Sequence, residues 1–190
     1  LIEVIDPRPD KTNEELANSV KYKRDEMGRV VRETREIDLV PGLHTIEYDY
    51  DYNGKLTRLT YPDAYHVDYE YYPGSGLLKS VTGSDNRKFA EYSNYQPSGK
   101  PGRVDYGSGS HTIYTYDPTT QRILTIYTEA PTIGALQNRQ YSYYKTGDVE
   151  AISLDNLNAE FNFTYDSLNR LETVDGNGWG FINYEYDEIG

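Results

Sequence analysis

Hydrophobic and polar residues alternate along much of the chain. In the segment 65–71, aromatic or aliphatic residues occupy the odd positions, and polar residues occupy positions 66, 68 and 70. Side chains of a strand point alternately to its two faces, so this order separates an apolar face from a polar one. Such alternation is typical of antiparallel sheet with one solvated face. The pattern therefore predicts an all-β chain.

The stretch Glu47–Leu56, EYDYDYNGKL, adds a turn signal to this alternation. Tyr48 and Tyr50 fall on one face of a strand that ends at Asp51-Tyr52-Asn53-Gly54. Asp is favoured at the first position of a type I turn, and Gly follows where a positive φ lets the chain return. Residues 55–59 then form the returning strand. The pattern Y-x-Y-D-x-x-G-[KR]-L thus predicts a β-hairpin.

The same pattern recurs down the chain. Its first aromatic residue stands at positions 22, 48, 69, 114, 141, 163 and 184, with differences of 26, 21, 45, 27, 22 and 21. The gap of 45 holds a more degenerate unit near Tyr92 and Tyr95. Fixed periods in this range indicate a repeat architecture. We predict structural roles, as aromatic ladders and turn residues, for Tyr48, Tyr50, Asp51, Gly54, Tyr69, Tyr71, Tyr114, Tyr116, Asp117, Tyr141, Tyr143, Gly147, Phe163, Tyr165, Asp166, Tyr184 and Tyr186, with Asp25 and Gly28 as further turn residues.

These units, together with Thr60-Tyr61-Pro62-Asp63 and Tyr106-Gly107-Ser108-Gly109, resemble the Rhs-repeat or YD-repeat proteins from about Val20 onward. Bacterial Rhs toxins, the insecticidal toxin-complex B–C cocoon and teneurin-like surface proteins carry this repeat. The resemblance implies antiparallel β-hairpin repeats that form one continuous, curved or spiralling sheet. In the toxins of the family, this sheet is a hollow shell around a toxic C-terminal polypeptide.

The resemblance supports two hypotheses of function. In the first, the chain is a structural segment of a secreted bacterial shell that encapsulates a C-terminal toxin until delivery. Its partners are then the adjacent repeats and the enclosed toxin. In the second, it is a cell-surface adhesion or carbohydrate-binding module, since exposed Tyr rings can stack on sugars. Burial of the repeated Tyr residues discriminates between the two, and neither hypothesis makes the chain an enzyme.

A calcium site is the alternative interpretation of Asp49-Tyr50-Asp51-Tyr52-Asn53-Gly54. These residues match the opening of an EF-hand loop, D-x-[DN]-x-[DN]-G, whose twelfth position supplies a bidentate Glu. Here the twelfth position is Thr60, and the flanking residues favour strands over helices. The hairpin is therefore the preferred interpretation, and we expect no metal.

Composition changes the picture of the core and of the partners. The 190 residues include 21 Tyr but only 4 Phe, 1 Met and 1 Trp, and the formal net charge is −12. Tyr rings bury area while their hydroxyls need partners, which suits a thin, half-wet sheet. The negative charge argues against nucleic acid and anionic membrane surfaces as partners, although it would suit a basic cargo. No apolar run reaches membrane-spanning length.

No catalytic or cofactor motif is convincing. There is no Cys, and His44, His66 and His111 are far apart in sequence without metal-ligand spacing. The Gly-Ser segments lack the nucleophile elbow, and no phosphate-binding glycine loop precedes a helix. Trp179 follows an Asn-Gly turn signal, and we interpret it as a packing anchor rather than a sugar platform. Asp117-Pro118 lies in a repeat turn, so the self-cleavage of the family is not transferred to it.

The predicted organisation is a lead-in strand or linker at 1–19 and a repeat sheet at 20–190 that is incomplete at its C-terminus. Asp6–Lys11 is expected to be irregular, Thr12–Glu15 to start a turn of helix, and Thr128–Arg139 to be a loop insertion. Asp187–Gly190 resembles a turn without its returning strand. We therefore expect a piece of a longer protein, with the toxin beyond Gly190.

Overall fold

The computed structural model describes residues 2–5, 19–37 and 40–187. These residues form sixteen β-strands and one 3-10 helix. Strands are antiparallel, and their order in the sheet is their order in the chain. The prediction of an all-β chain of antiparallel hairpins is therefore confirmed.

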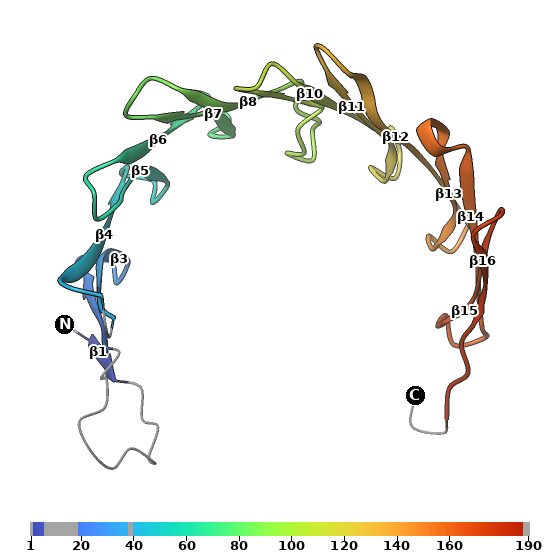
Figure 1. Cartoon of the computed structure of the whole chain (residues 1–190), viewed down its shortest axis with the longest axis horizontal. Coiled ribbons are helices and arrows are strands. Elements are labelled where there is room, and N and C mark those ends of the chain that lie inside the picture. The colour runs from blue at the N-terminus through green and yellow to red at the C-terminus, as the bar shows by residue number, and fades with distance from the viewer. Residues whose placement is uncertain (1, 6–18, 38–39, 188–190) are drawn as a thin grey trace. The chain divides into compact units, whose positions relative to one another are not determined.

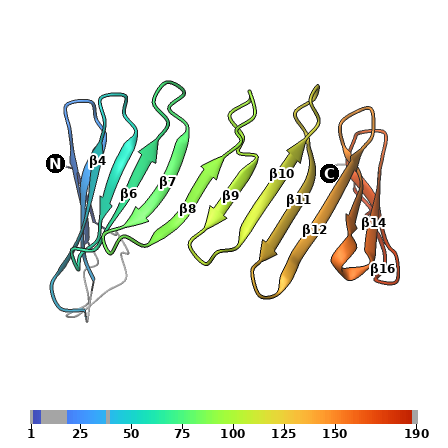
Figure 2. The same cartoon turned by 90° about the horizontal axis from the view of Figure 1, so that it is seen from above.

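The chain divides into two compact units, Leu1–Phe89 and Ala90–Gly190. Figures 1 and 2 show that the strands within each unit follow one another in chain order. The first unit contains β1 (Ile2–Ile5), β2 (Ser19–Arg24), β3 (Val30–Glu36), β4 (Leu43–Tyr50), β5 (Leu56–Thr60), β6 (His66–Tyr71) and β7 (Leu78–Gly83), and β8 (Lys88–Ser93) begins in it.

The second unit continues from Ala90 in β8. It contains β9 (Arg103–Tyr106), β10 (His111–Tyr116), β11 (Ile123–Ala130), β12 (Gly134–Tyr143), β13 (Val149–Leu154), the 3-10 helix η1 (Asp155–Leu157), β14 (Ala159–Tyr165), β15 (Leu171–Gly176) and β16 (Gly180–Asn183). Among the described residues of both units, no helix is long and apolar enough to cross a membrane.

Most repeat hairpins share one turn geometry, and the turns of β6–β7 and β10–β11 are one residue longer. In the hairpin β4–β5, the Gly54 N–H donates to the Asp51 carbonyl at 3.0 Å, and Gly54 has a φ of +82°. The pairing then shifts by one residue between Asp49 and Tyr50, so that Tyr50 pairs with Leu56. A turn followed by one left-handed residue and a bulge is a common three-residue hairpin loop. The same shift falls just before the residue that corresponds to Tyr50 in β2–β3, β6–β7, β10–β11, β12–β13 and β14–β15; this residue is Arg24 in β2 and Tyr in the others.

The core of each unit is shallow. In the first unit, Val67 is the buried apolar residue, and in the second these are Ala90, Val104 and Ala159. Within the described residues, no large side chain is less than 2% exposed. A single sheet layer buries area mainly between neighbouring side chains of one face, so half-buried Tyr rings replace an oily interior.

Two sequence predictions are wrong. Thr128–Arg139 is not a loop insertion, because β11 and β12 extend through most of it and pair up to Ala130 and Gly134. Pro131 lies in the turn and Gly134 has a φ of +78°, so both residues make the hairpin turn rather than break a strand. Trp179 is not a packing anchor, since it is 66% exposed in the turn between β15 and β16.

Three predictions lie outside the described residues. They are the irregular segment at 6–11, the helical turn at 12–15 and the turn that closes at position 190. Within the predicted lead-in at 1–19, the backbone of Ile2–Ile5 pairs with Ser19–Tyr22. The boundary between lead-in and repeat sheet stays a prediction.

Candidate functional site: the junctions between hairpins

The turn aspartates organise the backbone of their hairpins. Asp51 Oδ1 accepts hydrogen bonds from the N–H groups of Asn53 at 2.9 Å and Lys55 at 2.8 Å. Such contacts satisfy turn donors that have no strand partner. Asp25 and Asp166 accept the same pair of bonds and also bind an arginine, Arg29 or Arg170, through Oδ2 at 2.7 Å.

The other predicted turn residues vary this scheme. Asp117 caps a turn that is one residue longer, accepting from the N–H groups of Thr119 and Thr120. Its left-handed residue is Gln121, at a φ of +57°. Gly147 takes a φ of +110° in a turn whose first residue is Tyr144 instead of Asp.

In most of the described repeats, a tyrosine is bound to the hairpin before it. The donor is the hydroxyl of the aromatic residue at the third position of the pattern Y-x-Y-D-x-x-G-[KR]-L. It donates to the carbonyl of the residue that follows the preceding turn. We call this arrangement a tyrosine junction. The described junctions are Tyr50 to Val30 (3.0 Å), Tyr71 to Leu56 (2.8 Å), Tyr116 to Pro101 (3.1 Å), Tyr143 to Ile123 (2.7 Å), Tyr165 to Val149 (3.0 Å) and Tyr186 to Leu171 (2.6 Å).

A basic residue covers the ring at all but one of these junctions. It is the Lys or Arg of the repeat pattern, and it belongs to the preceding turn. The pairs, with the distance from the cationic centre to the ring centroid, are Arg29 over Tyr50 (4.7 Å), Lys55 over Tyr71 (5.1 Å), Lys100 over Tyr116 (5.5 Å), Arg122 over Tyr143 (5.6 Å) and Arg170 over Tyr186 (4.2 Å). A cation over an aromatic face stabilises by about 0.5–1 kcal/mol at exposed sites, and more when desolvated.

Some of these bases also reach the next turn. Arg29 Nη1 donates to the Asp51 carbonyl at 3.3 Å, and Lys100 Nζ donates to the Gln121 carbonyl at 2.8 Å. Lys55 Nζ makes the corresponding bond to the Gly76 carbonyl. Each such base therefore bridges two successive turns across one tyrosine ring, which couples neighbouring hairpins beyond their strand pairing.

The first aromatic residues of the repeat line the same face as the junction tyrosines. Each of them lies two positions before the junction tyrosine of its strand. They are Tyr48 in β4, Tyr69 in β6, Tyr114 in β10, Tyr141 in β12 and Phe163 in β14. Burial raises the pKa values of Tyr48 and Tyr114, and the Glu33 carboxylate adds to the effect at Tyr48. Glu33 is only 8% exposed and forms an ion pair with Arg35. The sequence analysis did not identify this buried carboxylate, since nothing in the repeat pattern signals it.

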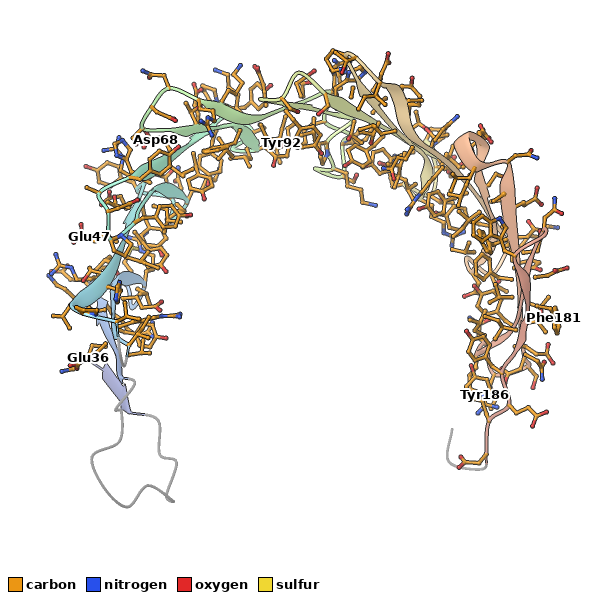
Figure 3. The ribbon with its side chains drawn as sticks, viewed as in Figure 1. Glu36, Glu47, Asp68, Tyr92, Phe181 and Tyr186 are labelled. Atoms are coloured by element: carbon orange, nitrogen blue, oxygen red, sulfur yellow. The ribbon has the colours of Figure 1, made fainter. Side chains whose placement is uncertain are left out.

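The opposite face of the sheet is polar. In the first unit, cross-strand ion pairs join Arg32 to Glu47 and Arg58 to Asp68, and Glu36, Glu47 and Asp68 lie on one side of the ribbon in Figure 3. In the second unit, Thr115 and Thr164 face Thr partners across the strands.

In Figure 3, Tyr186 and Phe181 lie on opposite sides of the second unit's ribbon. Tyr184 and Tyr186 follow β16 and are 40% and 38% exposed.

The titratable residues outside the junctions do not assemble a centre. His66 Nε2 lies 3.8 Å from Asp68 of the same strand, and His111 Nε2 lies 4.0 Å from Glu129 of the neighbouring strand. The two pairs are on different strands. Over residues 2–5, 19–37 and 40–187, no three His, Asp or Glu side chains are grouped to hold a metal ion.

Millimolar calcium is expected to leave the melting temperature unchanged. Asp51 Oδ1 already accepts two backbone N–H groups, and Thr60 continues β5 where an EF-hand would supply its Glu. Differential scanning calorimetry with calcium and with a chelator checks this. A calcium-dependent rise in melting temperature that disappears in Asp49→Ala would instead support the calcium-site interpretation.

Acid is expected to weaken the Asp166 turn. The Arg170 backbone N–H, followed by its guanidinium, holds the pKa of Asp166 below the ordinary value. A lowered folded pKa contributes stability at pH values above the unfolded pKa of about 3.9, and this contribution is lost as the pH falls through the folded value. Melting temperatures measured from pH 7 to pH 2 should therefore drop less steeply below pH 4 in Asp166→Asn. Parallel curves for the two proteins would contradict this role.

No family model matches the chain. The toxin subunit YenC1 of Yersinia entomophaga is 28% identical over 158 residues, which is 73% of this chain and 16% of that protein. The toxin subunit YenC2 of the same organism is 30% identical over 112 residues, 51% of this chain and 12% of that protein. The chain thus spans less than a fifth of the length of either relative.

Solved structures share the fold. The crystal structure of TcdB2-TccC3-Cdc42 superposes with a TM-score of 0.70 at 20% identity, covering 84% of this chain and 9% of that one. The Photorhabdus luminescens Tc holotoxin pore gives 0.69 at 21% identity, covering 84% and 9%. The resemblance to the Rhs/YD-repeat proteins is confirmed. The proteins with similar sequences are toxin subunits, and the solved structures that share the fold of this chain are Tc toxin structures.

The YD-repeat pattern predicted the tyrosines of the junctions but not the contacts of the basic residues. The donors of the junction bonds are the predicted aromatic residues at the third position of the pattern. These are Tyr50, Tyr71, Tyr116, Tyr143, Tyr165 and Tyr186. The role of the Lys or Arg was missed, although its fixed offset after the turn was a usable signal. The structural importance of the predicted repeat residues stays a prediction, which variants of Tyr50 and Gly54 can test.

Proposed function

We propose that this chain is a wall segment of a secreted bacterial toxin shell, which encapsulates a C-terminal toxic polypeptide until delivery. The tyrosine junction carries the proposal. Each hairpin offers its successor a sheet edge, a carbonyl and, in most cases, a cation, so the sheet can extend by equivalent steps. The adjacent repeats of the parent chain are then its closest partners. Toxin subunits among the relatives support the toxin context, and secretion fits such a subunit.

The chemistry of the tyrosine face suits enclosure without specific recognition. Junction hydroxyls are engaged by carbonyls of the chain itself, and most junction rings are covered by a basic side chain of the preceding hairpin. The junction hydroxyls are thereby occupied, and half-buried tyrosine rings form much of the remaining face. A polypeptide held against such a surface meets few groups that compete for its backbone. The role is structural, with no reaction assigned to the wall.

The experiment is electron cryomicroscopy of the full-length parent protein, with and without its C-terminal segment. The proposal predicts a closed hollow particle, with internal density that disappears when the C-terminal segment is removed. An open rod, or a compact solid particle, would overturn it. Release of the enclosed polypeptide at increasing salt tests the added idea of a basic cargo, and salt-independent release would contradict that idea alone.

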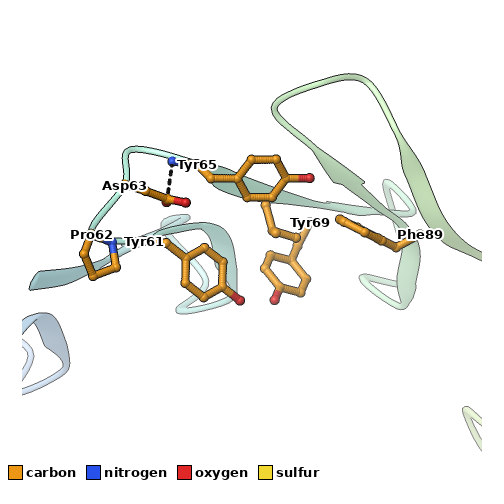
Figure 4. Close-up of a pocket in the computed structure, with 7 residues that line it drawn as sticks. Tyr61, Pro62, Asp63, Tyr65, Tyr69 and Phe89 are labelled. Carbon is orange, nitrogen blue, oxygen red and sulfur yellow. Dashed lines mark hydrogen bonds between the residues drawn. The ribbon is translucent and has the colours of Figure 1, made fainter. Parts of the chain in front are cut away.

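Carbohydrate binding is a second candidate, favoured by one hollow in the first unit. Its volume is about 670 Å³, and Tyr61, Tyr65, Tyr69 and Phe89 supply its aromatic lining (Figure 4). The Tyr61 and Tyr65 rings are 6.4 Å apart between centroids and tilted by 41°, and Tyr61 and Phe89 are 39% and 38% exposed. Aromatic rings left open to solvent can stack on sugar faces. Glycan-array binding that is lost in Tyr61→Ala would support this function over the shell, and an array without hits would remove it.

A further inference from the structure

One tyrosine junction departs from the others in charge. At the junction of Tyr165, the position after the turn is Asp148, whereas Lys or Arg covers the ring at the remaining described junctions. The Tyr165 hydroxyl still donates to the Val149 carbonyl at 3.0 Å. The backbone of the junction is therefore built as usual, but an anion replaces the cation.

The neighbouring contacts are reversed to match. At other junctions the base donates to the next turn, as Lys100 does to the Gln121 carbonyl. Here the next turn donates instead, because Asn169 Nδ2 binds Asp148 Oδ1 at 2.9 Å. The second oxygen, Asp148 Oδ2, is buried and has no hydrogen-bond partner. A buried carboxylate oxygen without a donor is costly, so such an atom calls for an explanation.

The surroundings form a recess with aromatic walls. A hollow of about 560 Å³ is lined by Asp148, Tyr144, Tyr165 and Asn169, with Lys145 exposed at its rim. Tyr144 stands where other turns have Asp, and its ring meets the Tyr165 ring edge to face at 6.3 Å between centroids. Both hydroxyls are engaged, Tyr144 with the Phe163 carbonyl and Tyr165 with that of Val149. The recess therefore offers ring surfaces and a carboxylate rather than hydroxyl donors.

We infer that this recess is a binding site for an organic cation, namely the ammonium or guanidinium group of a Lys or Arg side chain from a polypeptide packed against the tyrosine face. The inserted group would supply the positive charge that Arg or Lys supplies at the other junctions. It would donate to Asp148 Oδ2 after a small rotation of the carboxyl group and lie against the Tyr144 and Tyr165 rings. Aromatic rings next to a carboxylate are a common arrangement for binding such cations.

The electrostatics agree with this assignment. Burial, followed by the charge of Asp148, raises the pKa of Tyr165. The same negative potential attracts a cation. Nearby Asp166 is already bound by Arg170 and by two backbone N–H groups of its own turn, so Asp148 is the carboxylate left to receive the ligand.

Calorimetric titration of the parent protein with N-acetyl-L-argininamide tests the site. The matched probe is the citrulline analogue, which has nearly the same shape without the charge. We expect argininamide to bind about tenfold more tightly than the citrulline compound, and Asp148→Asn to lower argininamide affinity about tenfold, the loss of one charge-assisted hydrogen bond. Asp49→Asn, which removes an exposed carboxylate in the first unit, is the control and should leave binding unchanged.

A second variant makes the test independent of any loss of folding. Asp148→Arg restores the residue type of the other junctions, so it should abolish argininamide binding while keeping or raising the melting temperature. In the parent protein without its C-terminal segment, where no enclosed polypeptide competes for the site, equal binding of the two probes, no binding of either, or full affinity in Asp148→Asn would each overturn the inference. The source of the natural cation is read from the parent without its C-terminal segment. A gain in argininamide binding there assigns the cation to the enclosed polypeptide, and equal binding assigns it to another molecule. This readout does not depend on whether the particle is a closed shell.

Discussion

Replacing Tyr50 with alanine is expected to destabilise the chain by about 2–4 kcal/mol, near the range for truncating a large buried side chain. Three contacts are lost together. The ring is half-buried on the tyrosine face, Arg29 lies 4.7 Å above it, and its hydroxyl donates to the Val30 carbonyl at 3.0 Å. The loss also uncouples two hairpins, because Arg29 no longer rests on a ring between successive turns. Urea titration should show a lower midpoint.

Two variants separate these contributions. Tyr50→Phe keeps the ring and removes only the hydroxyl bond, so it should cost about 1 kcal/mol. Tyr52, two residues further on, is fully exposed in the turn, and Tyr52→Ala should change stability by less than about 0.5 kcal/mol. If Tyr52→Ala were as costly as Tyr50→Ala, the junction would not be the source of the stability.

Replacing Gly54 with valine is expected to cost about 1–3 kcal/mol through backbone strain. Gly54 has a φ of +82°, a region that β-branched residues avoid. An added Cβ would lie 3.5 Å from Arg29 Nη1, which is an ordinary contact, so the cost does not come from a clash. Denaturant titration measures the effect, and unchanged stability would refute the turn assignment.

The chain itself supplies the control for this variant. Asn169 occupies the equivalent position of the β14–β15 hairpin at a φ of +63°. Asn tolerates the left-handed region, because its short polar side chain can hydrogen-bond locally. Gly54→Asn should therefore cost less than half as much as Gly54→Val. Equal costs would point to the side-chain volume rather than to the backbone conformation.

Local patterns were sufficient to predict the hairpins. Alternation places Tyr48 and Tyr50 on one face, and Asp51 and Gly54 encode the turn between them. Both signals act within a few residues, so they are written in contiguous sequence and repeat with it. The confirmed antiparallel, chain-order sheet follows directly, since consecutive hairpins have their nearest partners in sequence.

The same local rules failed where a residue has more than one use. Pro131 and Gly134 were interpreted as signs of a loop, but here they form a tight turn between two long strands. Trp179 was expected to pack, yet it lies exposed in a turn, because a single sheet layer gives a turn residue little to pack against. Composition and turn signals do not say which strand ends remain paired.

The sequence by itself determined the period of the repeat, the two faces of the strands and the residues of the turns. Only the tertiary structure decided what joins one hairpin to the next. The contact between Arg29 and Tyr50 spans 21 residues, and that between Arg170 and Tyr186 spans 16. Such contacts depend on the stagger that the bulged turns impose on successive hairpins, which no local propensity encodes. For the same reason, the sequence analysis did not single out Asp148, and its unpartnered carboxylate oxygen was identified only in the structure, beside Tyr165.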